Sequence, residues 1–167
     1  MSEENPKVAV CPGSYDPVTN GHLDIITRAS NVFDKVVVGV VNQPVRKQKT
    51  LFTAEERKAF LAEATAELGN VEVEVFSNLL VEFAREQNAT AVVKGLRAIS
   101  DFEYEFEMNQ LNRLLAAEIE SMYIFASAAY SFLSSTGVKE MATFGGDVSE
   151  LVPARVAKEL GERLKRE

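Results

Sequence analysis

The sequence predicts an α/β fold with a doubly wound, five-stranded parallel sheet. Apolar, strand-like runs alternate with helical segments along the 167 residues, which is the order of a parallel sheet with right-handed crossovers. Residues 36–41 form a β-branched run without polar alternation, as expected of a strand buried on both faces. The connections are short, and no repeat, low-complexity tract or linker divides the chain. Together these observations predict a Rossmann-like single domain over residues 1–167.

The elements of the first half follow from local patterns. Residues 8–10 are a short buried strand, and residues 23–33 continue with helical spacing after a Gly/Pro-rich turn. Residues 53–56, Thr-Ala-Glu-Glu, form a capping box for a helix that we expect to run toward Leu68. Residues 71–76 alternate between apolar and polar side chains, which is typical of a strand nearer the edge of a sheet.

The second half continues the same alternation and ends on two helices. The last helix has its proline in the first turn, where proline is well tolerated. In chain order, the patterns predict a helix over residues 79–88, a buried strand over 91–93, a long amphipathic helix over 101–117, a strand over 122–126, a helix over 134–141 and a charged helix over 153–166.

Composition narrows the classes of function. The formal net charge of −7 disfavours a nucleic-acid binder, which would normally carry a basic footprint. No apolar stretch approaches the ~18 residues of a membrane span, and the N-terminus does not resemble a signal peptide. A single cysteine, Cys11, excludes an intramolecular disulfide and suits a cytoplasmic protein. With one cysteine and one histidine, a structural zinc site is not expected.

Four segments that contain candidate ligand-binding residues follow predicted strands. They are residues 12–22, 42–49, 94–97 and 130–136. Ligands of doubly wound sheets bind beyond the carboxyl ends of the strands, near the topological switch point. We therefore expect these segments to converge at one edge of the sheet.

Residues 11–22 pass from a strand through a Gly/Pro-rich turn into a helix, an arrangement that binds phosphate through backbone amides. The chain's only histidine, His22, lies in the first turn of that helix and follows Gly21. Neither a Gly-x-Gly-x-x-Gly motif nor a P-loop is present. A capping turn with a partly exposed histidine is the simpler interpretation of the same residues.

Two further groups of polar residues suit a phosphate ligand, and each has a simpler explanation. Lys94 and Arg97 lie three apart after a strand and could face one ligand, or they could be solvated loop cations. The hydroxyls of residues 131–136 crowd a helix N-terminus and exceed the needs of one N-cap. Glu105 could simply favour the positive end of its helix dipole.

Residues 11–22 resemble the signature of the nucleotidyltransferase superfamily, (His/Thr)-x-Gly-His. Three other segments resemble the phosphopantetheine adenylyltransferase family within it. They are Lys94-Gly-Leu-Arg, Asp101-Phe-Glu-Tyr-Glu and the stretch 130–140, which contains Ser-Phe-Leu-Ser-Ser-Thr and Val-Lys-Glu. The resemblance extends in order from about residue 8 to the last helix. The family usually has serine where Thr136 stands, and threonine keeps the hydroxyl.

The resemblance implies transfer of the adenylyl group of ATP to 4′-phosphopantetheine, giving dephospho-coenzyme A and pyrophosphate in coenzyme A biosynthesis. It also implies Mg²⁺ on the ATP phosphates without protein ligands, in-line attack without a covalent intermediate, feedback inhibition by coenzyme A and a cytoplasmic homohexamer of two stacked trimers. It implies no nucleic acid or membrane partner.

The resemblance also implies roles for individual residues. His22 would stabilise the transition state, and Ser14 would lie between the two substrates. Either Arg46 or Lys47, with Lys47 slightly favoured, would take the place of the family's phosphate-binding lysine. The implied ATP site comprises Ser14, Tyr15, His22, Gly95, Leu96, Arg97, Glu105, Tyr130, Ser131, Phe132, Leu133, Ser134, Ser135 and Thr136. The implied phosphopantetheine site comprises Ser14, Arg46, Lys47, Leu80 and Lys94.

Two alternative functions are weighed against this one. Another small-molecule nucleotidyltransferase, acting on a nicotinamide nucleotide or glycerol phosphate, would share the opening turn but lack the segments at 94–97 and 101–105. A non-catalytic nucleotide-binding module would not need His22 or the full set of cations.

Overall fold

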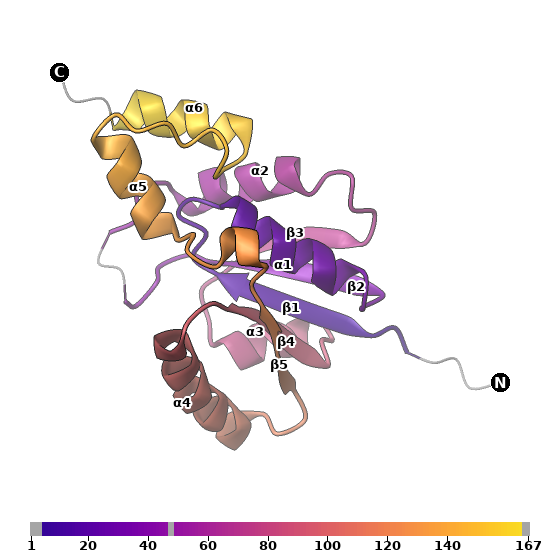
Figure 1. Cartoon of the computed structure of the whole chain (residues 1–167). Helices are drawn as coiled ribbons and strands as arrows, with labels where there is room; N and C mark the ends of the chain where they lie inside the picture. Colours follow the sequence, from indigo (N-terminus) through magenta and orange to yellow (C-terminus); the bar gives the residue numbers. More distant parts are fainter. Residues whose placement is uncertain (1–4, 47–48, 165–167) are drawn as a thin grey trace.

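The computed structural model describes residues 5–46 and 49–164, and it contains one five-stranded sheet (Figure 1). The strand order is β3-β2-β1-β4-β5, and every neighbouring pair is parallel. The predicted fold class is therefore confirmed. The strands are β1 Val8–Gly13, β2 Lys35–Val41, β3 Val71–Phe76, β4 Ala91–Leu96 and β5 Glu120–Phe125.

Helices cover both faces of this sheet, as Figure 1 shows. The switch point lies between β1 and β4, because the chain builds outward from β1 to β3 and then returns to place β4 on its other side. The helices are α1 Asn20–Ser30, α2 Ala54–Ala64, α3 Leu80–Glu86, α4 Ile99–Leu115, α5 Ser135–Thr143 and α6 Ala154–Arg163, with a short 3₁₀ helix, η1, at Ala128–Tyr130.

The alternation of side chains along the central strands divides the core into two. Ala9 and Cys11 of β1 belong to the larger cluster, which packs against α1, α2, α5 and α6. Val8 and Val10 belong to the smaller cluster under α3. The valines of β2 divide in the same way, which explains why that segment is apolar throughout.

Two predicted boundaries are wrong. The helix expected to reach Leu68 ends at Ala64, because the Thr65 hydroxyl bonds the Leu61 carbonyl and a turn closes from Thr65 to Leu68. The strand predicted over residues 91–93 continues to Leu96, because Lys94, Gly95 and Leu96 pair with β5. These three residues therefore belong to the end of β4 rather than to the loop after it.

The other boundaries differ from the predicted ones by at most three residues. β1 extends to Gly13, where it still pairs with β2. α4 begins at Ile99, and α6 ends at Arg163 with Leu164 as its C-cap, short of the predicted end at residue 166, which itself lies outside the described residues. Among the described helices, none is long and apolar enough to cross a membrane.

Candidate functional site

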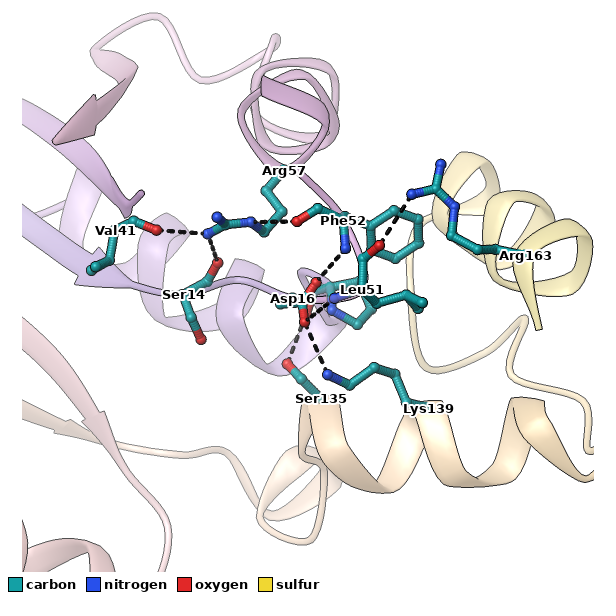
Figure 2. A network of polar contacts seen from close by, with 10 residues as sticks. Ser14, Asp16, Val41, Leu51, Phe52, Arg57, Ser135, Lys139 and Arg163 are labelled. Atoms are coloured by element: carbon teal, nitrogen blue, oxygen red, sulfur yellow. Dashed lines mark hydrogen bonds and ion pairs between the residues drawn. The ribbon is translucent and has the colours of Figure 1, made fainter. Parts of the chain in front are cut away.

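The four segments predicted to converge do so at the carboxyl edge of the sheet. The turn after β1 contacts the start of α5, since the Ser135 hydroxyl donates to the Pro17 carbonyl at 2.7 Å. The end of β4 contacts the same region, since Nη1 of Arg97 donates to the Leu133 carbonyl at 2.6 Å. Arg57 of α2 joins the end of β2 to the turn after β1, and Lys139 of α5 bonds Asp16 in the same turn (Figure 2).

His22 is held at the third position of α1 by a reciprocal capping box. The Thr19 hydroxyl accepts from the His22 amide at 3.3 Å, and Nδ1 of His22 accepts from the Thr19 amide at 3.0 Å. Because Nδ1 accepts a backbone N–H, the neutral imidazole carries its proton on Nε2. The capping turn and the histidine chemistry are thus one arrangement: the cap selects the tautomer that can donate from Nε2.

The sequence contained a signal for this cap. Thr19 and His22 have the spacing of a capping box, with histidine in place of the usual glutamate or glutamine. The Tyr15 ring also packs against the imidazole, at 5.0 Å between ring centroids in an edge-to-face geometry.

Tyr15 itself is buried, and its hydroxyl donates to the Cys11 carbonyl at 2.9 Å. Burial raises the pKa of this phenol well above its usual value, with a smaller contribution from Cys11. Burial also raises the pKa of the Cys11 thiol to about 12, so this cysteine is a core residue without thiolate character. Tyr15 remains a predicted ATP contact, but its phenol oxygen is already bonded to β1.

Asp16 anchors the segments around the candidate site, a role that no local pattern in the sequence predicts. Its carboxylate is fully buried and accepts from the amides of Leu51 and Phe52, both at 2.9 Å, and from Nζ of Lys139 at 3.0 Å (Figure 2). Desolvation raises the pKa of this carboxyl, but the two backbone bonds and Lys139 outweigh it, so the pKa lies below the usual value. Asp16 thus joins three parts of the chain: the turn after β1, the residues that precede α2, and helix α5.

The cation predicted for phosphopantetheine and the carboxylate predicted for ATP form an ion pair. Nζ of Lys94 lies 2.7 Å from Oε2 of Glu105, and both side chains are mostly buried. The Glu105 carbonyl accepts from the Tyr123 hydroxyl at 3.2 Å. Arg97 is engaged as well, since its Nε lies 3.3 Å from Asp101. A phosphate entering here would therefore meet cations whose positions are already fixed by other residues.

The loop after β2 reaches α4 through Arg46. Its guanidinium lies 3.4 Å from the centre of the Tyr104 ring, a cation–π contact. Lys47, the other candidate for the phosphate-binding cation, lies outside the described residues. The choice between the two residues therefore stays a prediction.

Three of the hydroxyls in residues 131–136 have hydrogen-bond partners within the protein. Ser134 is the N-cap of α5 and accepts from the Gly137 amide at 3.0 Å, while Ser131 donates to the Ala128 carbonyl and Ser135 to Pro17. The O–H groups of Ser131 and Ser135 are thus taken by carbonyls, which leaves fewer hydroxyl donors for a ligand than the sequence suggested. The candidate donors to a ligand are Ser134, whose cap bond uses only the oxygen as acceptor, Thr136 and the first amides of α5.

Gly95 and Leu80 have structural explanations beside their predicted roles. A Cβ on Gly95 would lie 2.9 Å from Cγ1 of Ile25, so the close packing of α1 on β4 requires glycine at this position. Leu80 is the first residue of α3 and packs against the smaller core cluster.

Comparison with known proteins finds similarity to nucleotidyltransferases, both in a family model and in individual relatives. The cytidylyltransferase-like family model matches residues 10–141. The chain is 58% identical over 146 residues to the phosphopantetheine adenylyltransferase of Rubrobacter xylanophilus, an alignment that covers 87% of this chain and 88% of that protein. It is 54% identical over 158 residues to the phosphopantetheine adenylyltransferase of Streptomyces coelicolor, covering 94% and 97%.

A solved structure shows the same fold at low sequence identity. A putative nicotinate-nucleotide adenylyltransferase from Vibrio parahaemolyticus superposes with a TM-score of 0.68 at 18% identity, covering 98% of this chain and 97% of that one. This likeness concerns the fold alone, whereas the sequence identities above cover nearly the whole chain. The chain therefore belongs to the phosphopantetheine adenylyltransferase family of cytidylyltransferase-like nucleotidyltransferases.

Proposed function

We propose that this protein transfers the adenylyl group of ATP to 4′-phosphopantetheine, giving dephospho-coenzyme A and pyrophosphate for coenzyme A biosynthesis. The single structural observation that supports the chemistry is the capping box that directs the His22 proton to Nε2. A neutral imidazole fixed in this tautomer is a ready donor for a phosphate oxygen at a helix N-terminus. The identities of 50 to 58% to named phosphopantetheine adenylyltransferases support the choice of substrates.

The reaction needs positioning more than a base. An oxygen of the phosphopantetheine phosphate, already an anion, attacks the α-phosphorus of ATP. The bond from that phosphorus to the bridging oxygen of the β-phosphate breaks, and pyrophosphate leaves with the electron pair. In such an in-line displacement, charge grows on the oxygens of the transferred group. Nε2–H of His22 would donate to one of these oxygens, and no covalent intermediate with the protein is formed.

The surrounding cations would hold the phosphates in line. Lys94 would hold the phosphopantetheine phosphate, either by sharing its bond with Glu105 or by exchanging it. Arg97, fixed by the Leu133 carbonyl, would face ATP. Arg46 or Lys47 would complete the site from the loop after β2, and Ser14 would lie between the substrates.

Magnesium would enter with ATP. In the described part of the chain, no group of three or more His, Cys, Asp or Glu side chains is placed to hold a metal ion. The carboxylates of Asp16, Asp101 and Glu105 are each paired with a Lys or Arg, and the cations, hydroxyls and amides at this edge fit phosphate oxygens rather than Mg²⁺. We therefore treat the magnesium complex of ATP as the substrate, with water and phosphate as the ligands of the ion.

We also propose a cytoplasmic homohexamer that coenzyme A inhibits. Apolar side chains on α4 and β5 support the assembly, because an exposed patch of this kind marks an interface. Coenzyme A contains both the pantetheine arm and an adenine nucleotide, so it would compete for the same site. The net charge of −7 supports the absence of a nucleic-acid partner. The exposed apolar residues of α4 and β5 are Phe102, Phe106, Leu111, Leu114, Leu115, Met122 and Phe125.

A pyrophosphate-release assay tests the proposed function. The purified protein is given Mg²⁺ and ATP with 4′-phosphopantetheine, and in parallel arms with nicotinate mononucleotide or glycerol 3-phosphate. The proposal is supported if pyrophosphate is released only in the arm with 4′-phosphopantetheine and if a product with the mass of dephospho-coenzyme A is detected there. Release in another arm would identify a different nucleotidyltransferase, and binding of ATP without release in any arm would indicate a non-catalytic module.

A further inference from the structure

Arg57, in the first turns of α2, is a fully buried charged side chain surrounded by backbone carbonyls. Its Nε donates to the Phe52 carbonyl at 3.1 Å, and its Nη1 donates to those of Ser14 at 2.6 Å and Val41 at 2.8 Å (Figure 2). Its Nη2 donates to the Asn42 carbonyl at 2.9 Å. One planar group therefore ties together the turn after β1, the end of β2 and the segment before α2.

This arrangement costs desolvation free energy that a residue with only a packing role would not incur. Burying a charge is costly unless it is paired or fully hydrogen-bonded. Within the described part of the chain, the Arg57 side chain donates to backbone carbonyls, and Asp16 acts on its charge from farther away. An apolar side chain could pack here without that cost, so the value of arginine lies in the fixed directions of its N–H groups.

Two of the carbonyls that Arg57 holds, those of Ser14 and Asn42, belong to the two segments that carry the substrate contacts of the proposed function. Ser14 precedes Tyr15, whose φ of 48° lies in the left-handed region, and the same turn leads to His22. Asn42 begins the loop that carries Arg46 and Lys47. Arg57 is thus placed where it can set the separation between the two sides of the site without reaching a substrate itself.

We propose that Arg57 is a positioning residue for adenylyl transfer, which fixes the Ser14 turn and the Asn42 loop relative to each other through their carbonyls. This inference rests on the proposed function. It predicts an effect on the reaction of two bound substrates that exceeds the effect on ATP binding, because misplacement by about 1 Å can lower a rate ~100-fold.

Three variants separate positioning from general stability. Arg57→Lys keeps the charge but cannot reproduce the planar fork, and Arg57→Met removes the charge at similar length. Leu61→Ala is the matched control, because Leu61 is fully buried in the same helix and belongs to the core cluster. For each variant we would measure the thermal midpoint, kcat, KM for phosphopantetheine, the Kd of ATP by calorimetry, and hydrogen–deuterium exchange of residues 12–16 and 40–44.

The expected result is selective. Arg57→Lys lowers kcat/KM for phosphopantetheine by ~10- to 100-fold while the Kd of ATP changes far less, and it speeds amide exchange in both segments. Leu61→Ala lowers the thermal midpoint at least as much but leaves kcat/KM near that of the parent protein. Arg57→Met behaves like Arg57→Lys or worse.

Other results would overturn the inference. An Arg57→Lys protein with parental kcat/KM and unchanged exchange in the two segments removes the positioning role, while the proposed function stands. So does a Leu61→Ala protein that loses kcat/KM in proportion to its midpoint, because Arg57 would then act only through stability. A parental protein that releases no pyrophosphate with phosphopantetheine overturns the proposed function, and the positioning role with it.

Discussion

The buried carboxylate of Asp16 lies 3.0 Å from Nζ of Lys139, a contact between residues 123 positions apart in the chain. The same carboxylate accepts the amides of Leu51 and Phe52. The turn that leads to His22 is therefore anchored to α5 and to the start of α2 by one side chain. This anchor, together with Arg57, makes the carboxyl edge of the sheet a connected structure rather than a set of separate loops.

Asp16→Asn should lower the free energy of unfolding at pH 7 by about 3 kcal/mol, because it leaves Lys139 and two amides without their charged acceptor. The pKa of Asp16 is lowered in the folded state, so its stabilising contribution is present above its unfolded pKa and is lost as pH falls through the folded pKa. Chemical denaturation from pH 7 to pH 3 should show the gap between parent and variant narrowing below about pH 4. A gap that stays constant over that range would contradict the assignment.

His22→Ala should lower kcat by about 100- to 1,000-fold and change KM for ATP little, because the Nε2 donor acts most strongly as charge builds in the transition state. His22→Gln is the matched variant, since glutamine at this position can still close the capping box with Thr19. If the cap is kept and the loss persists, the loss belongs to the imidazole. Steady-state kinetics that show only a raised KM for ATP, with kcat unchanged, would contradict transition-state stabilisation by His22.

Lys47→Ala and Arg46→Ala should have different kinetic effects. Since Arg46 stacks on Tyr104, we expect Arg46→Ala to raise KM for phosphopantetheine by loosening the loop, and Lys47→Ala to cause the larger fall in kcat. Tyr104→Ala should reproduce the Arg46→Ala effect, and Tyr104→Phe should not. The opposite pattern, with Arg46→Ala the most damaging to kcat and Tyr104→Ala silent, would assign the phosphate contact to Arg46.

Gly95→Ala should lower the free energy of unfolding by about 1 to 3 kcal/mol, because the new methyl group would lie 2.9 Å from Ile25. Combining it with Ile25→Ala should give a loss smaller than the sum of the two single losses. Gly69→Ala, where no atom lies within 4 Å of the new Cβ, serves as a near-neutral control in the same denaturation series. Strict additivity of the Gly95 and Ile25 losses would exclude the clash.

Local patterns were sufficient to predict much of this protein. The buried run of β2 and the capping box at Thr53 and Glu56 appear in the structure where the sequence placed them. Both features depend on residues within a few positions of each other, so the sequence alone is enough to predict them. The end of β4 was misjudged because the polar Lys94 interrupts the apolar run, although pairing with β5 carries the strand onward.

The sequence by itself determined the fold class, the edge at which the chemistry-bearing segments meet and the family, because periodicity, connection length and motif spacing are properties of the chain. Only the tertiary structure decided how those segments are held: Asp16 on Lys139, Arg57 on the carbonyls of Ser14 and Asn42, and Lys94 on Glu105. The contacts of Asp16 with Lys139 and of Arg57 with Ser14 join residues 123 and 43 positions apart, and the other two join successive elements of the chain. Their donors and acceptors are backbone groups or ordinary charged side chains, whose partners depend on distance and burial in the folded molecule.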